Sequence, residues 1–134
     1  MNASDVISPL QTSGFTCKQK RATVYACELN VGAAGFEATV ATAGNAVTRV
    51  SAIVRIEANL EPGPGTLVFL TWIATIPYSG DQASVTEIAS WVTGHVQART
   101  SAAATIGRYI YTLEASVPGT LYLTVEGDGK RWPA

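Results

Sequence analysis

The stretch FEATVATAGNAVTRVSAIVRI, residues 36–56, decides the fold class, because two alternating runs flank a Gly-Asn pair. Apolar or small side chains take every second position in both runs, at Phe36, Ala38, Val40 and Thr42, and then at Val50, Ala52, Val54 and Ile56. A period of two is typical of a strand with one buried face. Gly44 and Asn45 accept the positive φ angles that a two-residue hairpin turn requires. The stretch therefore predicts an antiparallel β-hairpin whose second face is mostly polar.

The two cysteines of the chain fall in neighbouring strand-like runs, Cys17 in residues 15–18 and Cys27 in residues 23–29. A hairpin centred on Ala22 places the two cysteines directly opposite each other, where side chains of antiparallel strands come within disulfide reach. We expect a disulfide, and two reduced, half-buried cysteines in a cytosolic protein are the alternative. Because disulfides persist in oxidising compartments, the disulfide favours an extracytoplasmic protein.

A further hairpin is predicted near the end of the chain, from residues 107–113 and 121–125. Pro118 and Gly119 between them fit the central positions of a type II turn. The second strand contains no charge, and charges are what protect the edge of a sheet. At an edge this strand would favour self-association or partner binding, whereas a central strand would be paired on both sides. The sequence leaves both positions open.

Residues 84–96 carry the clearest helical pattern. Ser84 and Glu87 have the spacing of a capping box, in which the two side chains satisfy free backbone amides at a helix start. Apolar residues then recur at helical spacing, at Val85, Ile88, Ala89, Val92 and Val96. The segment predicts an amphipathic helix with Ile88 and Val92 buried.

Two other segments have weaker helical signals. Residues 66–76 are continuously apolar, which fits either a buried strand or a buried helix. Pro77 follows them and favours a helix that ends there, because proline cannot continue the backbone hydrogen bonds. Residues 5–13 predict a short first helix that Ser4 or Asp5 caps.

The segment EPGPG, residues 61–65, is the strongest break in the chain. About sixty residues on each side are few for independent domains, so we expect a loop within one domain, residues 1–134. The predicted fold is α+β, with antiparallel hairpins forming one sheet packed against the amphipathic helix and a second short helical region. This order of elements is similar in architecture to secretion-chaperone-like binding domains, a similarity that no motif carries.

Composition excludes several classes of function. Net charge is −1, and charged residues make up 14% of the chain, where about a quarter is usual. The basic residues are scattered, and nucleic-acid binding needs a basic stripe, so we expect no nucleic-acid partner. No apolar run reaches the ~20 residues of a transmembrane helix. Residues 1–5 lack the basic and apolar regions of a signal peptide. Because the expected disulfide favours export, the chain is expected to be the mature part of a longer exported precursor.

No motif for catalysis, metal binding or cofactor binding is present in the sequence. His95 is the only histidine and falls near the end of the amphipathic helix, where a solvated histidine interacts favourably with the helix dipole. Two cysteines and one histidine do not complete a structural zinc site. We therefore expect no catalytic residue, no metal and no cofactor.

Tyrosines of the last hairpin are the remaining candidates for a site. Tyr109 and Tyr111 point to the same side of their strand, since they are two residues apart. Together with Tyr122, if the register allows it, they would form an aromatic patch beside Thr124. These four residues are the candidate binding surface.

The sequence therefore favours a non-catalytic binding domain, the soluble part of an exported, lipoprotein-like or cell-envelope protein. Its partner would be a protein or a small apolar ligand, and a homodimer is compatible with the hairpins. Two alternatives stay open: a cytoplasmic chaperone-like or scaffold domain that dimerises, and a small enzyme or carrier with an apolar cavity.

Overall fold

The computed structural model describes residues 1–57, 60–78, 80–127 and 132. Its first half consists of one helix and four strands: α1 (Ala3–Thr12), β1 (Thr16–Arg21), β2 (Val24–Val31), β3 (Ala34–Ala43) and β4 (Ala46–Arg55). The helical middle consists of α2 (Pro64–Thr75), the short 3-10 helix η1 (Ile76–Tyr78) and α3 (Gln82–Ala98). Three strands follow: β5 (Ala102–Ile106), β6 (Tyr109–Glu114) and β7 (Thr120–Gly127).

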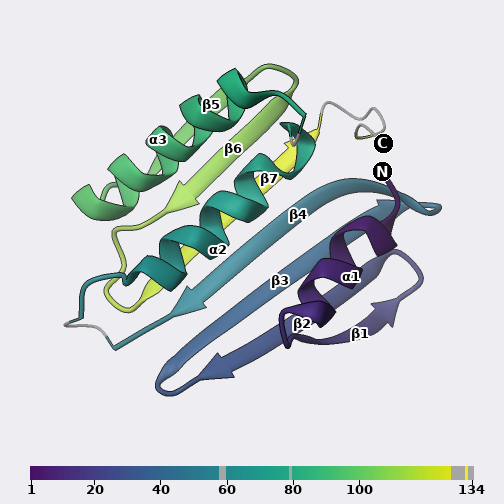
Figure 1. Ribbon diagram of the computed structural model, residues 1–134, viewed down its shortest axis with the longest axis horizontal. Helices are drawn as coiled ribbons and strands as arrows, with labels where there is room; N and C mark the ends of the chain where they lie inside the picture. Colours follow the sequence, from purple (N-terminus) through teal and green to yellow (C-terminus); the bar gives the residue numbers. More distant parts are fainter. Residues whose placement is uncertain (58–59, 79, 128–131, 133–134) are drawn as a thin grey trace.

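All seven strands form one antiparallel sheet in the order β1-β2-β3-β4-β7-β6-β5. The first four strands follow one another along the chain, and the last three return so that β7 pairs with β4. The pairing of β4 with β7 joins the segments before and after residues 61–65 in a single sheet. The protein is thus α+β, as the sequence predicts, with β1 and β5 at the two edges (Figure 1).

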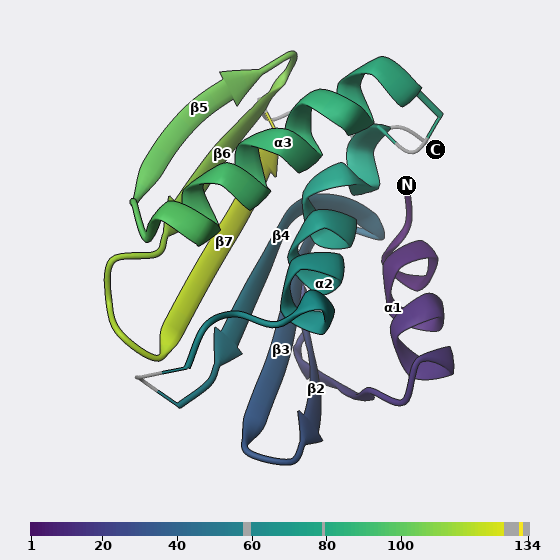
Figure 2. The ribbon, with the colours of Figure 1, turned by 60° about the vertical axis from the view of Figure 1, so that its left-hand side comes forward.

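The three helices lie on the same face of the sheet (Figures 1 and 2). Alternate side chains of the central strands are fully buried beneath them, at Val50, Ala52, Val54, Leu121, Leu123 and Val125. We call the opposite surface the open face. One row of small or short side chains crosses it in register, at Ala26, Thr39, Ser51, Thr124, Thr112 and Ala103.

The hairpin over residues 36–56 is confirmed. Gly44 and Asn45 connect β3 to β4, and Gly44 has a φ of 60°, in the left-handed region that favours glycine. Phe36 pairs with Val54 and Val40 pairs with Val50, so the residues predicted to be buried share one face. The expected hairpin of β6 and β7 is also present, and Gly119 in its connection has a φ of 80°.

The central helical prediction is confirmed, but the capping prediction is wrong. Helix α3 begins at Gln82, two residues before Ser84, and Asp81 is its N-cap. The Asp81 carboxylate accepts hydrogen bonds from the Ser84 hydroxyl at 2.8 Å and the Ser84 amide at 3.3 Å. These hydrogen bonds lower the pKa of the Asp81 carboxyl below its usual value. Asp81 accepts two hydrogen bonds from one serine and therefore determines where the helix starts.

The other two helical segments are helices as well. Residues 66–75 lie in α2, and the chain then tightens into η1 at Pro77. Helix α1 begins at Ala3, with Asn2 rather than Ser4 or Asp5 at its N-cap. The Asp5 carboxylate accepts a hydrogen bond from the backbone N–H of Asn2 at 2.8 Å. This bond satisfies a backbone donor that has no partner within the helix.

Strand β7 is central, because β4 pairs with it on one side and β6 on the other. The sequence is compatible with either an edge or a central position for residues 121–125, and the structure excludes the edge. The edge on this side of the sheet is β5, a strand that the sequence analysis did not predict.

Candidate functional site

The predicted disulfide is present in the edge hairpin of the first half. Cys17 pairs with Cys27 in the register of β1 and β2, with Cα atoms 4.0 Å apart, and their sulfur atoms are bonded. Gln19 also pairs with Tyr25 as a hairpin centred on Ala22 requires. The register shifts between Gln19 and Arg21, so a bulge closes the hairpin. The disulfide ties the edge strand to the rest of the sheet.

An apolar hollow lies next to this hairpin, between α1, α2 and strands β2 and β3. Its volume is about 490 Å³. We call it the apolar groove and define it by its lining residues, Pro9, Leu10, Ser13, Phe15, Leu29, Val31, Phe36, Gly65, Val68, Phe69 and Trp72. None of these residues carries a charge. Residues of α1 and α2 line the groove, and these two helices stand apart on the helical side of the sheet (Figure 2).

Three phenylalanines pack at the base of the apolar groove. Phe15 stacks on Phe69 with ring centroids 5.5 Å apart and planes inclined by 21°. Phe36 meets the same Phe69 ring edge-on, also at 5.5 Å and with planes at 82°. Aromatic pairs in these two geometries stabilise the fold by more than the burial of their surface alone would. The base is therefore an ordered apolar surface that joins the segment after α1, strand β3 and helix α2.

One face of α2 supplies a wall of the groove. Gly65, Val68, Phe69 and Trp72 fall at the spacing i, i+3, i+4 and i+7, which puts them on the same side of a helix. Phe69 is buried, whereas Val68 is 69% exposed at the rim. A Cβ atom at Gly65 would meet no other atom within 4 Å, so the glycine leaves that end of the wall open.

The opposite wall depends on how α1 ends. Gly14 follows the helix with a φ of 101°, and the Phe15 amide donates a hydrogen bond to the Leu10 carbonyl oxygen at 3.0 Å. A glycine with positive φ reverses the chain at a helix C-terminus. This reversal turns Phe15 back under the helix. A second apolar side chain, Val31 at the end of β2, is 58% exposed on this side of the groove.

The structure separates the four residues of the candidate tyrosine surface. Tyr109 and Tyr111 are buried on the helical side, where Tyr109 contacts the rings of Tyr78 and Trp132 at 5.3 Å. Tyr122 and Thr124 alternate with buried Leu121 and Leu123 and so lie on the open face. A patch that contains all four does not form, because β6 and β7 each direct alternate residues to opposite faces.

Tyr111 has a structural part in the core. Its hydroxyl donates a hydrogen bond of 2.7 Å to the Ala74 carbonyl oxygen near the end of α2, and its ring lies 6.0 Å from that of Trp91. Burial, with the neighbouring Tyr78 and Tyr109, raises the pKa of the Tyr111 hydroxyl well above its usual value. A phenol with a raised pKa is a poorer acid, so this environment keeps Tyr111 neutral and bound to α2.

His95 lies near the C-terminus of α3, as expected. Its Nδ1 atom is 2.8 Å from the Thr100 hydroxyl oxygen, and its ring lies 5.2 Å from that of Trp91. The helix ends at Ala98, and its C-cap residue Arg99 has a φ of 56°. The Arg99 guanidinium donates a hydrogen bond to the Leu60 carbonyl oxygen at 2.9 Å. The imidazole thus takes part in the contacts that end α3.

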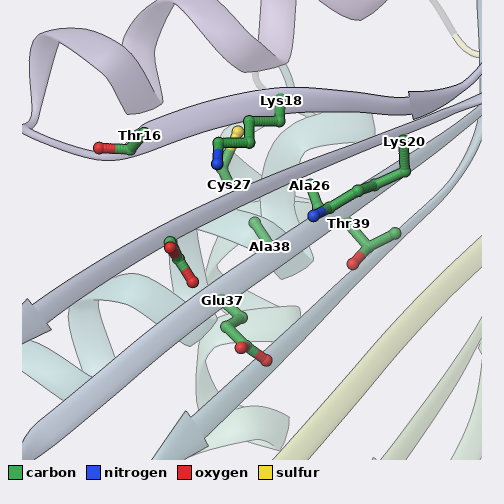
Figure 3. A pocket seen from close by; sticks show the side chains of 9 residues that line it. Thr16, Lys18, Lys20, Ala26, Cys27, Glu37, Ala38 and Thr39 are labelled. Carbon is green, nitrogen blue, oxygen red and sulfur yellow. The ribbon is translucent and has the colours of Figure 1, made fainter.

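A smaller and polar hollow, about 190 Å³, lies across β1, β2 and β3 (Figure 3). Side chains of both signs line it, with Lys18 and Lys20 from β1 and Glu28 and Glu37 from β2 and β3. Glu37 also forms an ion pair with Arg55 at 2.8 Å, and both side chains are substantially exposed. Mixed, solvated charges of this kind contribute little binding energy. The apolar groove is therefore the stronger candidate site.

The described part of the chain contains no cluster of three or more His, Cys, Asp or Glu side chains that could hold a metal ion. Nor does any helix found there combine the length and the apolarity needed to cross a membrane.

The aromatic residues of the apolar groove come from both halves of the chain, and the sequence analysis did not bring them together. Phe15 follows α1, Phe36 lies in β3, and Phe69 and Trp72 both lie in α2, so these four residues come from three separate segments. The only local signal is the spacing of Gly65, Val68, Phe69 and Trp72 in α2. That spacing does not reveal that Val68 stays exposed.

Comparison of this chain with protein-family models, with curated proteins and with solved structures finds no match in any of the three.

Proposed function

We propose that this protein is a non-catalytic binding protein whose apolar groove takes a small apolar ligand. The observation that carries the proposal is the groove itself, an uncharged hollow of about 490 Å³ above an ordered aromatic base. Sites for small molecules are concave, mostly apolar and commonly roughly 300–1,000 Å³ in volume. The groove falls within that range.

The lining indicates what kind of ligand fits. No side chain in the wall supplies a charge, so the part of the ligand inside the groove is uncharged. Phe69 and Trp72 offer flat aromatic surfaces to an acyl chain or a ring. Val31 and Val68 at the rim would lose their exposure to water when a ligand enters, and burial of apolar surface favours binding.

A small ligand fits the groove better than a partner helix does. A helix that docks in a groove places apolar anchors along several turns, at i, i+3 or i+4 and i+7. Here the aromatic side chains instead converge on a single ring, Phe69, which contacts both Phe15 and Phe36. That arrangement is compact rather than elongated.

The disulfide supports an extracytoplasmic site of action. Cys17 and Cys27 are bonded, and no free cysteine occurs in the described chain. Reducing compartments keep thiols free, so a structural disulfide favours the cell envelope or secretion. The protein would act there as a secreted domain or as the folded part of a lipoprotein.

Binding of N-phenyl-1-naphthylamine, a neutral apolar dye that fluoresces when it leaves water, tests the groove. We expect saturable fluorescence with the parent protein. Val68→Lys places a charge at the rim and should weaken binding at least tenfold, because the ammonium group must be desolvated or displaced. The matched control is Val117→Lys, since Val117 is equally apolar, is 56% exposed and lies outside the groove.

Equal dye affinity for the parent, Val68→Lys and Val117→Lys would overturn the proposal, as would the absence of saturable binding to the parent. A loss of binding in both lysine variants would place the dye on a nonspecific apolar surface and would also count against it.

A further inference from the structure

We propose that edge strand β5 pairs with β5 of a second copy of this chain, so that two sheets join into one across a two-fold axis at Ala104. The inference goes beyond ligand binding, because it concerns the opposite edge of the sheet from the apolar groove. The groove lies over β2 and β3, while β5 is at the far end of the strand order. Pairing there leaves the groove accessible.

The two edges of the sheet differ in how they are protected. Edge strand β1 has the sequence TCKQKR, in which Lys18, Lys20 and Arg21 discourage pairing with another strand. Edge strand β5 has the sequence AAATI, without a charge or a proline. An uncharged edge of this kind is a template for a further strand. The contrast indicates that β5 is the edge at which association occurs.

The hairpin geometry fixes which backbone groups of β5 face outward. A two-residue turn at Gly107 and Arg108 makes Ile106 and Tyr109 a hydrogen-bonded pair. Hydrogen bonding alternates along the strand, so Ile106, Ala104 and Ala102 bond inward to β6. Ala103 and Thr105 therefore direct their N–H and C=O groups away from the sheet.

These outward groups complement those of an identical strand. With the two-fold axis at Ala104, Ala103 of each copy lies opposite Thr105 of the other. Both of these pairs are of the hydrogen-bonded type, so four backbone hydrogen bonds form around the axis. The same surface serves both copies, as a two-fold interface requires. Side chains at the centre are alanines, which leave room for close approach.

A pairing of two five-residue strands buries a small area, so the dimer is expected to be weak and to depend on concentration. Sedimentation velocity of the full chain over a wide concentration range should show reversible exchange from monomer to dimer. Thr105→Pro removes an outward N–H and leaves the inward bonds of β5 in place, a position where sheets tolerate proline. This variant should remain monomeric at every concentration, with the circular dichroism of the parent.

The control variant is Thr112→Lys. Thr112 pairs with Ala103 but lies one strand inward, with its side chain on the open face. If the dimer forms through the edge, Thr112→Lys should still dimerise. If the dimer instead stacks through the open face, Thr112→Lys should abolish it and Thr105→Pro should not, and the proposal is then wrong.

Hydrogen exchange of the parent provides a test that does not depend on how well a variant folds. The amides of Ala103 and Thr105 should exchange more slowly as the protein concentration rises, whereas the amides of β1 should not change. A parent that stays monomeric at the highest concentration, or amides of β5 whose exchange is independent of concentration, would overturn the proposal.

Discussion

Phe15 and Phe69 stack with their ring centroids 5.5 Å apart, although 53 positions separate them in the chain. Phe15 follows α1, and Phe69 lies in the middle of α2. Their contact is therefore a long-range link between the first helix and the second, and it forms the base of the apolar groove. Binding and stability should both depend on it.

Phe69→Ala should lower the free energy of unfolding by about 3–5 kcal/mol, since it removes a buried ring and leaves a cavity between Phe15 and Phe36. Urea unfolding followed by circular dichroism measures the change. Val68→Ala is the matched control, one residue earlier in the same helix but exposed, and it should stay within about 0.5 kcal/mol of the parent. Similar losses in the two variants would contradict this assignment of faces.

Ile88→Ala tests the packing of α3 on the sheet. Ile88 is fully buried, so its truncation should cost about 2–4 kcal/mol in thermal or urea unfolding. Glu87→Ala, at the exposed neighbouring position, should change stability little. A loss below about 0.5 kcal/mol for Ile88→Ala would mean that the helix presents another face to the core.

Reduction of the disulfide between Cys17 and Cys27 should destabilise the protein by about 2–3 kcal/mol, because the cross-link restricts the unfolded chain over a short loop. Urea unfolding with and without a phosphine reductant measures the difference. A variant with both Cys17→Ala and Cys27→Ala should not respond to the reductant. Two free thiols in denatured protein that was purified without reductant would show that the bond is not formed.

Alkaline pH should destabilise the fold through Tyr111. The folded-state pKa of its hydroxyl is raised by burial, while an unfolded tyrosine ionises near pH 10. The contribution of Tyr111 to stability is therefore complete below about pH 10 and is lost as the pH rises from there toward the folded-state pKa.

Tyr111→Phe separates this effect from that of the other tyrosines. It should cost about 1 kcal/mol at neutral pH, through loss of the hydrogen bond to the Ala74 carbonyl oxygen. Above about pH 10 it should lose stability less steeply than the parent does. Parallel pH curves for the parent and Tyr111→Phe would show that the buried hydroxyl is not the titrating group.

The sequence predicts the local parts of this fold well. Gly44 and Asn45 specify a turn, and apolar residues alternate with other residues in the strands on both sides of it. The pairing of Cys17 with Cys27 follows because the two residues are equally far from Ala22, the centre of their hairpin. Both predictions depend only on neighbours in the chain. The start of α3 was misplaced because Ser84 and Glu87 have the spacing of a capping box, while Asp81 three residues earlier is the better acceptor for free amides.

The sequence alone does not predict which distant segments of the chain pair or pack together. The pairing of β4 with β7 brings together segments that lie about seventy residues apart, and no local pattern specifies it. Strand β5 has little apolar alternation, since its first three residues are alanines, so periodicity does not distinguish it from a loop. The apolar groove is also a long-range feature, because its residues from α1, β2, β3 and α2 share a site only after the helices have packed on the sheet.

The most direct measurement of the central claim is an NMR titration with N-phenyl-1-naphthylamine that follows the three tryptophan indole N–H signals. Trp72 lies in the apolar groove, whereas Trp91 packs against Tyr111 and Trp132 is buried against Tyr109. Binding in the groove should shift the Trp72 signal progressively to saturation and leave the other two nearly unchanged. A titration that moves Trp91 or Trp132 most, or that leaves Trp72 unmoved at saturating dye, would contradict the account.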